Sequence, residues 1–129
     1  MSHTRLVNIK NNPKIVENES YVYIGRGSIY GNPYSHIDMS TALVKVENRD
    51  EAVDFHDEWL DGKRKIEIDD PDNEGQKIEL APPTIEQILE LEDCILGCFC
   101  APKRCHGSNY IRRIEEYRER EKLKDKDLF

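Results

Sequence analysis

Residues 94–100 have the sequence Cys-Ile-Leu-Gly-Cys-Phe-Cys, which is a nearly continuous apolar run. A strand that is buried on both faces, as at the centre of a parallel sheet, shows such a run instead of an alternating pattern. We expect a helix on each side of it, one over residues 84–92 and one that begins at Cys105 or His106. A buried strand between two helices is typical of a layered α/β fold.

Local patterns indicate the remaining elements. Three further strands are expected at residues 4–9, 20–24 and 41–46, and one further helix is expected at residues 49–60. Residues 61–80 are expected to form a charged β-hairpin that is inserted on the surface. Residues 122–129 are expected to be a frayed tail. We therefore expect residues 1–129 to form a single α/β domain: a small, compact three-layer (Rossmann-like) domain with a mostly parallel central sheet.

Charge and hydropathy exclude several classes of partner. The 26 acidic residues outnumber the 19 basic ones, and the net charge of −7 argues against non-specific binding of nucleic acid, which needs a basic face. The chain has no apolar run of 18 residues, so no membrane partner is expected. Its first residues lack the apolar core of a signal peptide, which predicts a cytoplasmic protein. A protein partner for the acidic surface stays an alternative.

The glycine loop, residues 25–33, follows the expected strand at residues 20–24. Its three glycines expose backbone N–H groups, and three polar side chains accompany them, so the candidate substrate-binding residues are Gly25, Arg26, Gly27, Ser28, Gly31 and Asn32. Exposed amides next to an arginine form a good cradle for an anion or a phosphate. The loop matches neither a Walker motif nor the dinucleotide fingerprint, and a tight structural turn is the alternative.

The chain's four cysteines are Cys94, Cys98, Cys100 and Cys105, and His106 follows the last of them. A thiol at a helix N-terminus has a lowered pKa and reacts more readily. We therefore take Cys100, Cys105 and His106 as candidate catalytic residues. Zinc bound by Cys98, Cys100, Cys105 and His106 would have the right number of ligands but the wrong spacing, so neither a metal nor a cofactor is predicted.

Both segments follow expected strands. Ligands of parallel α/β sheets bind beyond the carboxyl ends of the strands. If the two strands point the same way, the glycine loop and the cysteine segment, residues 98–107, meet in one cleft.

The two segments also carry a resemblance. Tyr-Ile-Gly-Arg-Gly-Ser-Ile-Tyr-Gly-Asn-Pro-Tyr at residues 23–34 and Cys-Phe-Cys-Ala-Pro-Lys-Arg-Cys-His-Gly at residues 98–107 resemble domain-of-unknown-function family 4326. The resemblance spans about residues 5–114 and implies a bacterial or phage protein. Phe99 replaces the family's usual tryptophan, and Ser108 stands where an acidic residue is common. If that acid is a general base in the family, the activity of this chain is in doubt.

These observations predict a protein that binds, and acts on, a nucleotide-like or phosphorylated small molecule. Arg26 would neutralise the anion, Asn32 would orient the substrate, and Cys100, Cys105 and His106 would supply the nucleophile or the acid and base. A non-catalytic module that binds a nucleotide or a protein, such as a phage sensor or inhibitor, is one alternative. A zinc-stabilised structural domain is the other.

Overall fold

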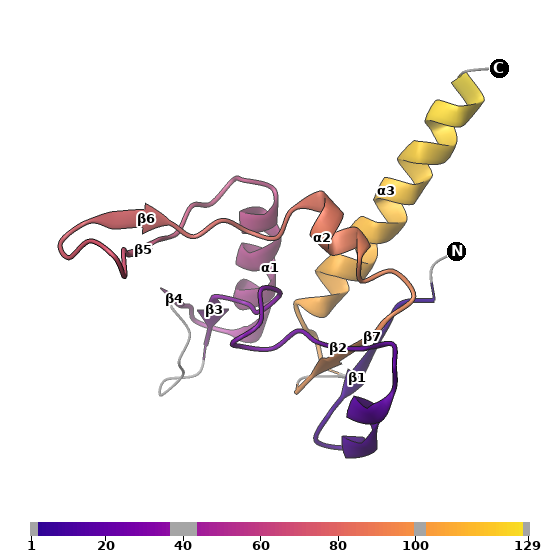
Figure 1. The fold of residues 1–129 in the computed structure, drawn as a ribbon, viewed down its shortest axis with the longest axis horizontal. Helices are drawn as coiled ribbons and strands as arrows, with labels where there is room; N and C mark the ends of the chain where they lie inside the picture. Colours follow the sequence, from indigo (N-terminus) through magenta and orange to yellow (C-terminus); the bar gives the residue numbers. More distant parts are fainter. Residues whose placement is uncertain (1–2, 37–43, 100–102, 128–129) are drawn as a thin grey trace.

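The computed structural model describes residues 3–36, 44–99 and 103–127, with side chains up to residue 123 in the last helix (Figure 1). Its strands are β1 (Arg5–Asn8), β2 (Tyr21–Tyr23), β3 (Tyr34–Ser35), β4 (Val44–Lys45), β5 (Glu67–Asp69), β6 (Lys77–Glu79) and β7 (Ile95–Cys98). Its helices are α1 (Arg49–Leu60), α2 (Ile85–Leu89) and α3 (Gly107–Asp127), together with a short 3-10 helix, η1 (Pro13–Glu17).

The main sheet has three strands in the order β1-β7-β2, and both outer strands run parallel to β7. Leu96 is the central partner, because it pairs with Leu6 of β1 and with Val22 of β2. All four residues of β7 are buried, which explains why this strand has an apolar run instead of an alternating pattern. The prediction of an α/β fold with a parallel sheet is confirmed, and a Rossmann-like arrangement in three layers stays a prediction.

Side-chain caps begin two of the helices where the sequence predicts them. The side chain of Asn48 accepts a hydrogen bond from the backbone N–H of Glu51 at the start of α1. Thr84 and Gln87 form a reciprocal capping box at the start of α2. Each cap satisfies backbone N–H groups that have no partner inside the helix.

The core lies between the main sheet and the helices α2 and α3. Its fully buried side chains come from β7, α2 and α3 and from residues that follow β2 and α2: Leu96, Ile88, Tyr110, Ile114, Ile24 and Leu91. A second cluster packs around Trp59 of α1 and includes Tyr34, Val46 and Ile66. The cluster between the main sheet and the helices α2 and α3 holds the carboxyl end of β7 in place, and the cysteine segment continues from that end.

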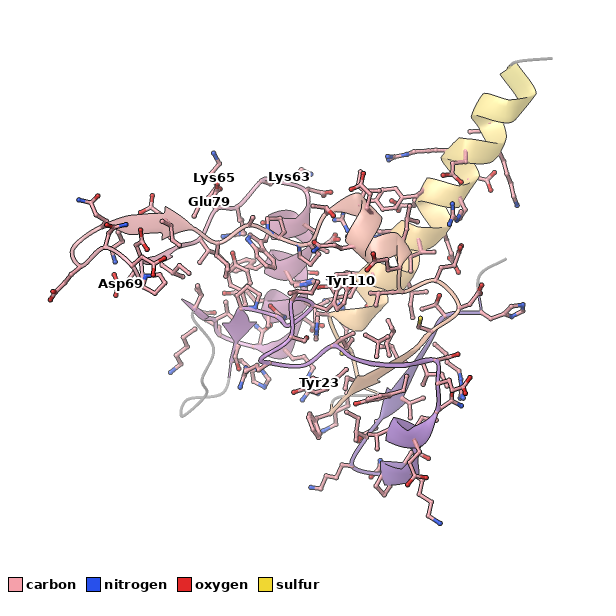
Figure 2. The ribbon with its side chains drawn as sticks, viewed as in Figure 1. Tyr23, Lys63, Lys65, Asp69, Glu79 and Tyr110 are labelled. Carbon is pink, nitrogen blue, oxygen red and sulfur yellow. The ribbon has the colours of Figure 1, made fainter. Side chains whose placement is uncertain are left out.

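Strands β5 and β6 form an antiparallel hairpin with Ile68 opposite Ile78. In Figure 1 this hairpin and the distal part of α3 extend from opposite sides of the molecule. Figure 2 shows the charged side chains of Asp69 and Glu79 on this hairpin and those of Lys63 and Lys65 on the loop that leads to it from α1, whereas Tyr110 lies in the middle of the molecule. The hairpin is thus a charged projection that contributes little to the core around the main sheet.

Several boundaries differ from the sequence expectation. Strand β7 begins at Ile95, so Cys94 precedes the strand instead of lying on its face. The half-buried Cys94 lies with its sulfur 3.5 Å from the carbonyl oxygen of Glu90. Helix α3 continues to Asp127, past the point where the sequence predicts fraying. In the described part of the chain, no helix has the length and apolarity that crossing a membrane requires.

Candidate functional site

The glycine loop leaves the carboxyl end of β2 and folds back on itself in two tight turns. The backbone N–H of Ser28 donates to the carbonyl oxygen of Gly25, and the N–H of Gly31 donates to that of Ser28. Gly27 has a φ of +91°, which favours glycine. A Cβ on Gly31 would lie 2.9 Å from the carbonyl oxygen of Gly25. The glycines at positions 27 and 31 are therefore required by the conformation of the loop itself.

Two polar side chains of the loop are engaged inside the protein. The hydroxyl of Ser28 donates to the carbonyl oxygen of Gly25 over 2.7 Å. The amide of Asn32 donates to the carbonyl oxygen of Ala52 in α1 and accepts from the backbone N–H of Tyr34. Asn32 thus attaches the loop to α1, and the substrate orientation expected of it stays a prediction.

His106 attaches the other side of the loop to the start of α3. Its Nε2 atom lies 2.8 Å from the carbonyl oxygen of Ile24 and 3.0 Å from that of Tyr30. Because both partners are acceptors, Nε2 carries the proton and Nδ1 is left as an acceptor. Burial lowers the pKa of His106, while the two carbonyl groups act in the opposite direction. The ring is therefore neutral near pH 7.

Cys105 lies two residues before α3, and its side chain is buried. Its sulfur is 3.6 Å from Nδ1 of His106, which is the free acceptor of that ring. The backbone N–H of Gly107, the first residue of α3, donates to the same sulfur over 3.5 Å. The thiol thus has an acceptor for its proton in Nδ1 and a backbone N–H donor at its sulfur, which are the contacts of a candidate nucleophile.

A first pocket of about 410 Å³ brings the two segments together, because Arg26 and Cys105 both line it. Two rings, Tyr23 at the end of β2 and Phe99 just after β7, form an edge-to-face pair in its wall with centroids 6.4 Å apart. The other lining residues are Gly25, Asn32, Tyr34, Ser35, His36, Arg49, Val53, Cys98, Arg104 and His106. The loops meet because β2 and β7 are parallel neighbours.

Three arginines line the first pocket, and they differ in their partners. Arg104 is bound by Asp50 and Asp54 of α1, at 3.0 and 2.7 Å. Arg26 and Arg49 form no ion pair with any residue that the structure describes. Their positive charges are therefore available to an anion in the pocket.

A second pocket, of about 530 Å³, lies on the other side of the glycine loop. Arg26 and Asn32 line both pockets, whereas Gly27, Ser28 and Gly31 line only the second one. The other lining residues are Ile29, Pro33, Trp59, Leu80, Ala81, Pro82, Pro83, Thr84 and Gln87. Of the predicted binding residues, Gly25, Arg26 and Asn32 thus share a pocket with Cys105 and His106.

The comparisons with known proteins agree with the resemblance. A family model described as "Domain of unknown function (DUF4326)" matches residues 7–116. The chain belongs to the DUF4326 family. The match includes the glycine loop, the cysteine segment and the beginning of α3. Neither the curated proteins nor the solved structures contain a match to the chain.

This DUF4326 chain also has a buried polar network behind the first pocket, which the sequence analysis missed. Asn109 donates to Nδ1 of His56 over 3.0 Å, so Nε2 of His56 carries the proton and points to the hydroxyl of Tyr110, 3.1 Å away. That hydroxyl donates to the carbonyl oxygen of Tyr30 over 2.8 Å, the atom that also accepts from His106. Every donor in this chain of hydrogen bonds has an acceptor.

Burial sets the charge state of the network. It lowers the pKa of His56 well below its ordinary value, and the neighbouring His106 and Arg113 act in the same direction. Burial also raises the pKa of Tyr110. The network is thus neutral around pH 7, and its role is to hold α1, α3 and the glycine loop in fixed positions.

The cysteines of the DUF4326 chain do not form a recognisable metal site in the described residues. No group of three or more His, Cys, Asp or Glu side chains within residues 3–36, 44–99 and 103–123 is arranged to hold a metal ion. Cys98 and Cys105 are buried and both line the first pocket. The predicted catalytic residue Cys100 lies outside the residues that the structure describes.

Proposed function

We propose that the first pocket binds a nucleotide-like or phosphorylated small molecule. One observation carries this proposal: two arginines and two aromatic rings line the same pocket. Arg26 and Arg49 form no ion pair with the described residues, and the rings are those of Tyr23 and Phe99. Guanidinium groups bind phosphate oxygens, and exposed aromatic rings stack on a nucleobase. Phe99 is 61% exposed, so its ring is accessible to such a base.

The second part of the proposal concerns chemistry. Cys105 is the candidate nucleophile, because its sulfur lies within reach of the unprotonated nitrogen of His106. The proton of the thiol would move to Nδ1, and the resulting imidazolium would be stabilised by the carbonyl oxygens of Ile24 and Tyr30. A base that is itself oriented by a third group is the usual arrangement for an activated nucleophile. This favours an enzyme over a binding module.

The finer expectations from the sequence belong to the same proposal. A three-layer, Rossmann-like arrangement would suit a nucleotide ligand at the carboxyl ends of β2 and β7. We propose the cytoplasm of a bacterial or phage-infected cell as the location, where the cysteines stay reduced. A module without turnover that senses the same ligand is the competing proposal, and the test below separates the two.

The test is incubation with a panel of nucleotides and sugar phosphates, followed by calorimetry and mass spectrometry. We expect micromolar to millimolar binding that Arg26→Ala and Arg49→Ala each weaken by about tenfold, the loss of one charge-assisted contact. The control Lys65→Ala removes an equal charge from the loop between α1 and β5, which lines neither pocket, and should change nothing. The proposal is wrong if no compound of the panel binds, or if the control weakens binding as much as the two arginine variants.

Mass spectrometry of the same samples decides between enzyme and binding module. A product that forms with the parent protein and not with Cys105→Ser would support catalysis by this thiol. Retention of an unchanged ligand by both proteins would support the module. Because serine has nearly the size of cysteine, binding should survive the substitution in either case.

A further inference from the structure

The glycine loop separates two pockets that share one exposed cation. Along the chain, Gly25 lines the first pocket, Arg26 lines both, and Gly27 lines the second. The backbone therefore passes from one pocket to the other at Arg26. Volumes of about 410 and 530 Å³ both lie in the range of about 300–1,000 Å³ that is usual for small-molecule sites.

The second pocket has the character of a site for a flat apolar ring. Its wall includes the 57%-exposed Ile29 and the prolines Pro82 and Pro83. The polar groups of the wall are largely engaged elsewhere: Nε1 of Trp59 donates to the carbonyl oxygen of Leu80, and the capping box occupies Thr84. The cation of Arg26 at its border is thus combined with mainly apolar surface.

The crossing point between the pockets is open. Apart from Gly27 itself and its chain neighbours Arg26 and Ser28, no described residue has an atom within 4 Å of the position that a Cβ on Gly27 would take. A phosphate group can therefore approach the backbone next to Arg26 without meeting a side chain. Bare backbone beside an arginine is a favourable surface for a phosphate or a diphosphate.

We propose that the ligand is a dinucleotide, in which two ring systems are joined by a phosphate or diphosphate bridge. One ring stacks on Phe99 and Tyr23 in the first pocket, and the other lies against Ile29 and the prolines in the second. The bridge crosses the loop at Arg26. This inference rests on the proposed function, because it extends the ligand of the first pocket into the second.

The single tryptophan of the chain makes the second pocket observable. Trp59 is the only tryptophan in the sequence, and it lines the second pocket and not the first. Titrations of the full chain with two matched pairs of probes are therefore informative: diadenosine diphosphate with AMP, and diguanosine diphosphate with GMP. We expect at least one dinucleotide to change the emission of Trp59 and to bind about tenfold or more tightly than its mononucleotide, since the second ring binds as a tethered group.

Two truncations and a matched control assign the rings to the pockets. Phe99→Ala should weaken both members of a pair, whereas Ile29→Ala should weaken the dinucleotide by about fivefold and leave the mononucleotide unchanged. Ile85 is 52% exposed on α2 and lines neither pocket, so Ile85→Ala should leave all affinities unchanged.

Failure of this inference differs from failure of the proposed function. Suppose that a mononucleotide binds and depends on Phe99, while its dinucleotide binds no more tightly, leaves Trp59 unchanged and is insensitive to Ile29→Ala. The second pocket then takes no part, and the dinucleotide proposal is overturned while the first pocket stands. Absence of binding by all four probes and by the wider panel would overturn both.

Discussion

The Nε2 atom of His106 lies 2.8 Å from the carbonyl oxygen of Ile24. This hydrogen bond joins the residue before α3 to the residue before the glycine loop, 82 residues earlier in the chain. The ring that is a candidate base for Cys105 thus also fixes the loop that separates the two pockets. The two roles use different nitrogen atoms, so they are open to separate tests.

Substitution of His106 should separate the two roles. His106→Ala removes the donor from two carbonyl groups, and we expect a loss of about 2–3 kcal/mol of unfolding free energy. His106→Gln offers an N–H close to the Nε2 position, so most of the stability should return, whereas the acceptor for the Cys105 thiol is lost. Urea unfolding measures the stability, and the rate of thiol alkylation measures the reactivity of Cys105. Equal destabilisation by both variants would contradict the role of Nε2.

Removal of the Tyr110 hydroxyl should destabilise the buried network. In Tyr110→Phe the buried Nε2–H of His56 loses its acceptor, and an unsatisfied buried donor costs about 1–3 kcal/mol. Tyr21→Phe is the matched control, because the Tyr21 hydroxyl forms no hydrogen bond with the described residues and its removal should cost less than about 0.5 kcal/mol. Chemical denaturation of the two variants checks the difference, and similar values would contradict the network.

The buried histidines predict a dependence of stability on pH. Burial lowers the pKa values of His56 and His106 in the folded protein below the ordinary value of 6.5, which they regain on unfolding. Below pH 6.5 the unfolded chain therefore binds protons that the folded protein does not. The free energy of unfolding should be level above about pH 7.5 and fall at lower pH, by up to about 1.4 kcal/mol per pH unit for each histidine.

The same measurement in His106→Gln provides the control for the pH effect. One of the two titrating groups is absent, so the slope between pH 6.5 and 5.5 should be smaller than that of the parent protein. Asp61 does not interfere, because Arg113 lowers the pKa of its carboxyl and its contribution is lost only in more acidic solution. A slope that is the same in both proteins would assign the effect to other groups.

The backbone contact between Gly25 and Gly31 predicts a sensitive position in the loop. In Gly31→Ala the new Cβ would lie 2.9 Å from the carbonyl oxygen of Gly25 and 3.3 Å from the Cα of Arg26. Both neighbours are backbone atoms and cannot rotate away, so we expect a loss of about 1–3 kcal/mol and weaker binding of ligand. A melting curve and a nucleotide titration measure the two effects. Unchanged values in both would show that the loop tolerates the added atom.

The main sheet and the meeting of the two segments follow from local patterns. The apolar run around Leu96 predicted a buried central strand, and parallel pairing with β2 places both loops at the same sheet edge. Such a prediction needs only the pattern of apolar residues along the sequence and the general rule for ligand sites in parallel sheets. The edge-to-face pair of Tyr23 and Phe99 lies at this edge, since each ring is close to the end of one of these strands.

The buried network was beyond the reach of sequence reasoning, for a physical reason. His56 lies on α1 between Phe55 and Asp57, and its helical pattern does not distinguish a buried histidine from an exposed one. Its partners Asn109 and Tyr110 are more than fifty residues away. Only tertiary packing brings the polar atoms together, so the network depends on distances that no local pattern encodes. The same holds for the second pocket, which both Ile29 and Pro82 line.

The order of strands in the main sheet has a consequence for synthesis of the protein. Strand β7 is the last of the three in the chain, yet it lies between β1 and β2 and pairs with both. During translation the first two strands must therefore wait for about seventy further residues before their common neighbour leaves the ribosome. His106 and Tyr110, which fix the glycine loop, emerge later still. We expect assembly of the ligand site to be among the final events of folding, and contacts of such long sequence separation to make it slow.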